Sequence, residues 1–167
     1  HTPLQISVPV NLTCLIPTNN PYVGQPARVT LRDLCRHFLD FRLEVVTKRF
    51  EHELQEVEAR LHILAGLALI AGSLDQVIKI IRNSSSRKDA REKLMATFQL
   101  DETQAEAILE TRLYQLARLE VDKIKAEQAE KEKRAKELRT LLGDEKKRWA
   151  VIRGELLELS KRYGDKR

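Results

Sequence analysis

A single apolar stripe constrains this chain more than any other feature of its sequence. The stripe runs from Leu39 to Ala68, a distance of 29 residues covered in eight steps of three or four, so the mean step is 3.625 residues. This period matches the turn of a straight α-helix and predicts one helix of about 40 residues, roughly 60 Å long, from Leu31 to a stop at Gly72. A helix with one apolar side needs a partner helix. The stripe consists of Leu39, Leu43, Val46, Phe50, Leu54, Val57, Leu61, Leu64 and Ala68.

The partner helix is expected in residues 119–142, a highly charged stretch with few apolar positions. Its apolar anchors are Ile124, Ala135, Leu138 and Leu142. Gly143 and Asp144 then place a helix stop next to a new N-cap. A last helix is expected to end at Gly164, and its apolar face consists of Trp149, Ile152, Leu156, Leu159 and Tyr163.

Three short helices are predicted between the two arm segments, each behind a capping signal. The predicted helices are Leu74–Arg82, Arg87–Phe98 and Glu102–Leu116. Their start signals are the pairs Ser73 with Gln76, Ser86 with Asp89, and Asp101 with Gln104. Since these segments are rich in apolar residues, we expect them to pack into a small globular head.

The first 30 residues follow a different period. Apolar residues occupy every even position from Leu4 to Ile16, which predicts a β-strand with one buried face. Pro9 on the other face indicates an edge strand. Residues 17–26 contain three of the five prolines and predict a loop, after which residues 27–30 could return as a short second strand.

Composition narrows the fold and the cellular setting. The 167 residues are 33% charged, with a formal net charge of +5, and contain only 6 Gly and 5 Pro. Such a chain favours long exposed helices over a sandwich or barrel, which needs many turns. No apolar run approaches the ~18 residues of a membrane span, and no signal peptide is evident. Two cysteines, Cys14 and Cys35, indicate buried thiols in a reducing cytosol rather than a disulfide framework.

Motifs for catalysis or metal binding are absent from the sequence. There is no phosphate-binding glycine loop, no HExxH, no zinc-type cysteine spacing and no nucleophile elbow. Glu102, Glu106 and Glu110 share one helix face, which we interpret as a solvated acidic face because no His or Cys joins them. A basic cluster (Lys131, Lys133, Arg134, Lys136 and Arg139) is offset by acids, so a solvated face is favoured over a nucleic-acid patch. The residues therefore predict an interaction module.

The predicted helix Glu102–Leu116 carries apolar residues on more than one side. A head this small cannot bury all of them, so we expect part of the surplus to form an isologous contact between two copies of the chain. The alternative is that all of these side chains belong to the internal core. The predicted homodimer interface consists of Ala105, Ile108, Leu109, Arg112, Leu113 and Leu116.

Four separated strings occur in the order found in one known family. They are LRDLCRHFLDFRLEVVTKRF (31–50), HILAGLALIAGSLDQVIKIIR (62–82), DETQAEAILETRLYQLARLE (101–120) and YGDKR (163–167). Together they resemble the A subunits of bacterial type IIA DNA topoisomerases, DNA gyrase and topoisomerase IV. Arg118 stands where gyrase versions commonly have glycine, which leans towards topoisomerase IV.

The resemblance implies a mainly α fold: a long antiparallel coiled-coil hairpin with a small helical head, preceded by a short β-strand or hairpin. Residues 1–30 would belong to a neighbouring tower region, residues 31–71 and 119–167 to the arm and return helix, and residues 72–118 to the head. The coiled-coil seam would consist of Val46, Phe50, Leu54, Val57, Leu61, Leu64, Ile124, Leu138 and Leu142.

The resemblance also implies a function. The head would be the C-gate, the homodimeric exit gate through which a passed DNA duplex leaves the enzyme. The parent would be a cytoplasmic, chromosome-associated isomerase that works with double-stranded DNA, ATP, Mg²⁺ and a B-type ATPase partner, without contact with a membrane. No tyrosine here matches the catalytic motif, so the segment itself would be non-catalytic and without cofactors. The alternative from another class is a free-standing coiled-coil arm that binds nucleic acid directly through residues 131–139.

Overall fold

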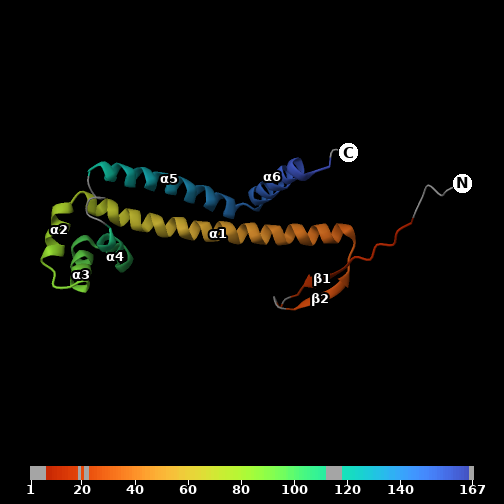
Figure 1. The fold of residues 1–167 in the computed structure, drawn as a ribbon, viewed down its shortest axis with the longest axis horizontal. Coiled ribbons are helices and arrows are strands. Elements are labelled where there is room, and N and C mark those ends of the chain that lie inside the picture. The colour runs from red at the N-terminus through yellow and green to blue at the C-terminus, as the bar shows by residue number, and fades with distance from the viewer. Residues whose placement is uncertain (1–6, 19, 21–22, 112–117, 166–167) are drawn as a thin grey trace. The chain divides into compact units, whose positions relative to one another are not determined.

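The computed structural model describes residues 7–18, 20, 23–111 and 118–165. The chain divides into two compact units, the first built on residues 1–46 and 152–167 and the second on residues 47–151. The described elements are two short strands and six helices, which confirms the predicted mainly α fold with an N-terminal β-hairpin (Figure 1).

Helix α1 spans Leu31–Ala71 without interruption, 41 residues in all, and confirms the length predicted from the apolar stripe. Its first turn has a capping box that we did not predict. The Asp33 backbone N–H donates to the Thr30 hydroxyl at 3.2 Å, and the Thr30 N–H and hydroxyl donate to the Asp33 carboxylate at 3.2 and 2.5 Å. The Thr30 bonds lower the pKa of Asp33. The helix ends immediately before Gly72, as predicted.

The head helices are α2 (Leu74–Arg82), α3 (Arg87–Phe98) and α4 (Glu102–Glu110). The predicted caps at Ser86 and Asp101 are confirmed. The predicted cap at Ser73 is wrong. The ψ of Ser73 is 34°, which is not extended, so its side chain makes no capping bond. Its backbone N–H instead donates to the Ile70 carbonyl at 2.9 Å and forms a turn.

Helix α4 is shorter than predicted. It stops at Glu110, because Thr111 adopts an extended conformation (φ −70°, ψ 130°), and the Thr111 hydroxyl donates to the Ala107 carbonyl at 2.7 Å. Residues 112–116 of the predicted helix lie outside the described residues.

Helices α5 (Arg118–Gly143) and α6 (Glu145–Tyr163) agree with the predicted segments. Between them, the Lys146 N–H donates to the Asp144 carboxylate at 2.9 Å, which confirms the predicted N-cap. Arg148 reaches back and donates to the Leu141 carbonyl at 3.1 Å and to the Leu142 carbonyl, so a side chain of α6 satisfies the last turn of α5.

The strands are β1 (Thr13–Pro17) and β2 (Gly24–Arg28), which pair antiparallel from Thr13 opposite Arg28 to Pro17 opposite Gly24. The predicted long first strand is therefore wrong in length. Val8 and Val10 lie outside it and are 74% and 75% exposed. Beyond β2, the Val29 N–H still donates to the Leu12 carbonyl at 2.9 Å, and residues 7–11 belong to no described strand.

No single helix in the described part of the chain is long and apolar enough to cross a membrane; α1 and α2 reach that measure only if joined, and they are bent by 93°.

Candidate functional site

The head has its own apolar core. Six buried side chains from the end of α1 and from the head form it, and Ile124 of α5 packs against it. They are Leu67, Ile70, Val77, Leu94, Leu100 and Ile108. Burial of this set explains why three short helices, each marginal alone, form a stable unit.

The structure places the predicted interface residues in different surroundings. Ala105 and Ile108 are 0% and 2% exposed, so the head of the same chain already covers them. Leu109 is half-buried against the core. Arg112, Leu113 and Leu116 lie outside the described residues. The apolar surplus of this segment is therefore smaller than the sequence indicated.

One large apolar side chain near the end of α1, next to the head, is exposed and was missed. Leu69 is 61% exposed, and no other large hydrophobic side chain is exposed in the described part of residues 47–151. The apolar run around it hides the signal, because its neighbours Leu67 and Ile70 are buried in the core.

The acidic face of α4 is exposed to solvent, as predicted, and its carboxylates also pair with arginines of α3. Arg91 of α3 lies 2.5 Å from Glu102. Arg87 bonds Glu110 at 3.0 Å and also pairs with Glu106. These carboxylates, Glu110 first, raise the pKa of Arg87. Two arginines spaced by four residues on α3 therefore pair with three glutamates spaced by four on α4. These ion pairs join α3 to α4.

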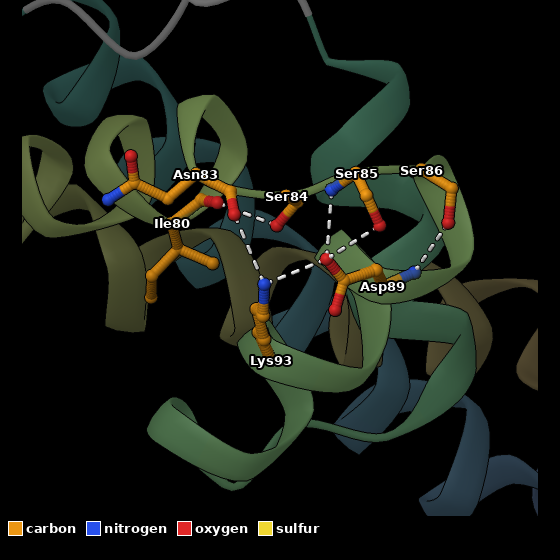
Figure 2. A network of polar contacts seen from close by, with 7 residues as sticks. All are labelled: Ile80, Asn83, Ser84, Ser85, Ser86, Asp89 and Lys93. Carbon is orange, nitrogen blue, oxygen red and sulfur yellow. Dashed lines mark hydrogen bonds and ion pairs between the residues drawn. The ribbon is translucent and has the colours of Figure 1, made fainter.

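The turn between α2 and α3 is held by a polar network (Figure 2). The Asp89 carboxylate accepts the Lys93 ammonium at 2.7 Å and the Ser85 N–H at 2.9 Å, and these bonds, Lys93 first, lower its pKa. The Lys93 ammonium also donates to the Asn83 carbonyl at 3.2 Å. The Asp89 N–H donates to the Ser86 hydroxyl at 3.2 Å, which caps α3. The network joins the end of α2 to the start of α3.

The start of α4 contacts α1. The Asp101 carboxylate accepts the Gln104 N–H at 2.8 Å and the Thr103 hydroxyl at 2.7 Å, and it also bonds Nε2 of His62. These bonds, with that of the Gln104 N–H first, lower the pKa of Asp101 to about 2. The Gln104 side-chain amide donates to the His62 carbonyl at 2.9 Å.

Within the second unit, α5 lies antiparallel to α1. Glu53 bonds Arg134 at 2.7 Å, and Arg60, later in α1, bonds Glu127, earlier in α5, at 2.7 and 3.0 Å. The Arg60 bond lowers the pKa of Glu127, and the Glu53 bond raises the pKa of Arg134. Because these charges alternate between the two helices, they favour one register of pairing.

The same ion pairs between α1 and α5 reduce the net positive charge of the basic cluster. Arg134 bonds Glu53, and Arg139 bonds Glu58 at 2.6 Å, so α1 neutralises both arginines. Lys133 and Lys136 are exposed on α5. The cluster thus offers less positive charge to a nucleic acid than its sequence indicates.

The predicted seam residues are covered to different degrees. Five of them are at most 7% exposed: Val46, Phe50, Val57, Leu64 and Leu138. Four are half-buried: Leu54, Leu61, Ile124 and Leu142.

The described residues hold no group of three or more His, Cys, Asp or Glu that could bind a metal ion. The prediction of two buried thiols is wrong, because Cys14 is half-buried and Cys35 is exposed, although both are free thiols. Tyr163 is 71% exposed, with the Arg162 guanidinium 5.4 Å from its ring centre. Tyr22 and Tyr114 lie outside the described residues.

Comparison with known proteins decides the family. Residues 1–157 match the family model for the A subunits of DNA gyrase and topoisomerase IV. The chain belongs to this family.

Relatives of both kinds align with the chain. The gyrase A protein of Halalkalibacterium halodurans is 42% identical over 167 residues, all of this chain and 19% of the relative. The gyrase A protein of Clostridium acetobutylicum is 39% identical over the same length. The topoisomerase 4 A protein of Staphylococcus epidermidis is 37% identical over 163 residues, 98% of this chain and 20% of the relative. The chain spans about a fifth of the length of these relatives.

Proposed function

We propose that this chain is the exit gate of a type II DNA topoisomerase, the segment through which two A subunits meet and part. The observation that carries the proposal is the match over residues 1–157 to the family of gyrase and topoisomerase IV A subunits. An arm of paired helices that ends in a helical head with its own core supports it.

The complete protein, in this proposal, is an ATP-dependent isomerase. It passes one DNA duplex through a transient break in another and so changes supercoiling or separates linked duplexes. Its partner is a B-type ATPase chain, and its cofactors are ATP and Mg²⁺. The present segment contributes no catalytic tyrosine.

The gate contact is proposed on the outer surface of the head. Ala105 and Ile108 already belong to the core, so the contact draws on Leu109 and on the exposed Leu69. Arg112, Leu113 and Leu116 remain sequence predictions for the same contact. A gate that opens in every cycle calls for a patch of moderate size, with an apolar centre and a polar border, rather than a permanent interface.

Sedimentation equilibrium of the 167-residue chain tests the gate. We expect a dimer for the unchanged chain, and a shift to monomer with unchanged helicity for Leu113→Asp and Leu69→Asp. Leu159→Asp is the matched control, because Leu159 is an exposed leucine of α6 (51%) and its variant should stay dimeric. A chain that is monomeric at high concentration would refute the gate, and a dimer unaffected by Leu113→Asp would refute this placement.

A DNA-binding assay separates the gate from a nucleic-acid arm. If the segment binds duplex DNA directly through residues 131–139, its affinity should fall steeply with salt. The exit gate predicts negligible affinity together with self-association.

A further inference from the structure

The contact between α4 and α1 is unlike the other contacts of the head, because it buries a polar side chain. Gln104 is 9% exposed and is the one buried polar residue in the described part of the chain. Its amide donates to the His62 carbonyl at 2.9 Å, so the bond ends on the backbone of α1, which cannot change rotamer. An unmade bond at this position would leave a buried amide without a partner, which is costly.

The atoms that start α4 are also the atoms that attach it. Gln104 accepts the Asp101 N–H at 3.3 Å with one end of its amide and donates to α1 with the other. Asp101 caps α4 with one carboxylate oxygen and bonds the His62 ring with the other. Detaching α4 from α1 would therefore disturb the capping box, so the first turn of the helix and its attachment form together.

A glycine on α1 makes this approach possible. A Cβ built on Gly66 would lie 3.0 Å from both Cβ and Cγ of Gln104. Real Cβ contacts are rarely this short, so a side chain at position 66 would force the Gln104 side chain to shift by a few tenths of an ångström. Elsewhere a glycine inside a helix is unfavourable, and here the close contact accounts for it.

We infer that His62, Gly66, Asp101 and Gln104 form an arm–head latch that fixes the orientation of the head on the second half of α1. The latch joins the head and the second half of α1 into one rigid lever. The last step of this inference rests on the proposed function: the gate opens by movement of these levers, and the heads do not swing on α1. These four are positioning residues.

Distance measurement between arm and head tests the latch. Spin labels are attached to Gln55→Cys on α1 and Glu92→Cys on α3, both exposed positions of the second unit, in a chain that carries Cys14→Ser and Cys35→Ser. Labelled chain is mixed with excess unlabelled chain, so that only distances within one molecule are recorded by pulsed electron resonance.

Two variants loosen the latch in different ways. Gly66→Ala inserts the side chain that meets Gln104, and Gln104→Met keeps the length of the side chain but removes both polar ends. The matched control is Gly154→Ala, because Gly154 is also helical and an added Cβ would meet nothing within 4 Å. Helicity and the unfolding midpoint are recorded for each chain to show that it folds.

We expect a single narrow distance for the unchanged chain and for Gly154→Ala, and a distribution about twice as broad, or shifted, for Gly66→Ala and Gln104→Met. A distribution that stays the same in both variants would overturn the latch. Sedimentation of the same samples separates the two ideas: a monomeric chain whose distance still depends on Gly66 would refute the gate and leave the latch standing.

Discussion

The two units of this chain bury their apolar residues very differently. Among the described residues, twelve large hydrophobic side chains are exposed, and eleven of them belong to the first unit; only Leu69 belongs to the second. The fifteen buried hydrophobic residues divide the other way, since only Val46 and Ile152 lie in the first unit. The second unit therefore has a core of its own, and the first has little.

Helix α1 shows this difference within one element. Its first 15 residues carry a second stripe at heptad spacing, which is exposed or half-buried: Leu31, Leu34, Phe38, Phe41 and Val45. Lys48, His52 and Gln55 continue the same face with polar side chains. Apolar residues thus follow a helical period in both halves of α1, but only those that are buried stabilise this chain.

The sharpest test compares one buried and one exposed apolar residue. Leu94 is 0% exposed in the core of the head, so we expect Leu94→Ala to lower the free energy of unfolding by about 2–5 kcal/mol. Phe41 is 61% exposed, and Phe41→Ala should change the free energy by no more than about 0.5 kcal/mol. Urea denaturation followed by circular dichroism measures both. Equal losses would contradict the contrast between the units.

Amide exchange sharpens the comparison along α1 itself. Backbone N–H groups near Phe50–Leu67 should exchange at least about tenfold more slowly than those near Arg36–Val45, because opening the second region exposes buried side chains. Hydrogen exchange followed by NMR gives the ratio residue by residue. Uniform protection along the helix would show that both halves open together.

The arm ion pairs should contribute less than the core. Arg134 and Glu53 have side chains 42% and 35% exposed, so solvent screens their attraction. A double-mutant cycle with Arg134→Ala and Glu53→Ala should give a coupling of about 0.2–1 kcal/mol that weakens with added salt. Leu54→Ala at the neighbouring seam provides a salt-insensitive control.

The smallest effect is expected at Asp101, and only in acid. Its folded-state pKa of about 2 lies below the ordinary 3.8, so the unfolded chain binds the proton more tightly. Its contribution to stability is therefore fully present above about pH 4 and is lost as the pH falls through 2. Asp101→Asn retains a capping oxygen but does not titrate, so its stability should fall less steeply between pH 4 and 2. Parallel slopes for the two chains would contradict this assignment.

Local sequence signals were sufficient for much of the fold. The 3.6-residue period set the length of α1, Gly72 marked its end, and Gly143 with Asp144 separated α5 from α6. The caps at Ser86 and Asp101 were also readable, because a cap is formed by residues only three positions apart. Ser73 has the same residue pattern but a different backbone conformation, so this local signal failed where the turn from α1 imposed its own geometry.

Other features depended on which segments meet in space. The sequence shows two apolar stripes at the start of α1 but not which of them is covered, and it shows three glutamates on α4 but not the arginines of α3 that pair with them. The contact of Gln104 with the backbone of α1 across Gly66 joins residues far apart in the chain. Burial and ion pairing depend on distances between helices, and only the packed structure sets those distances.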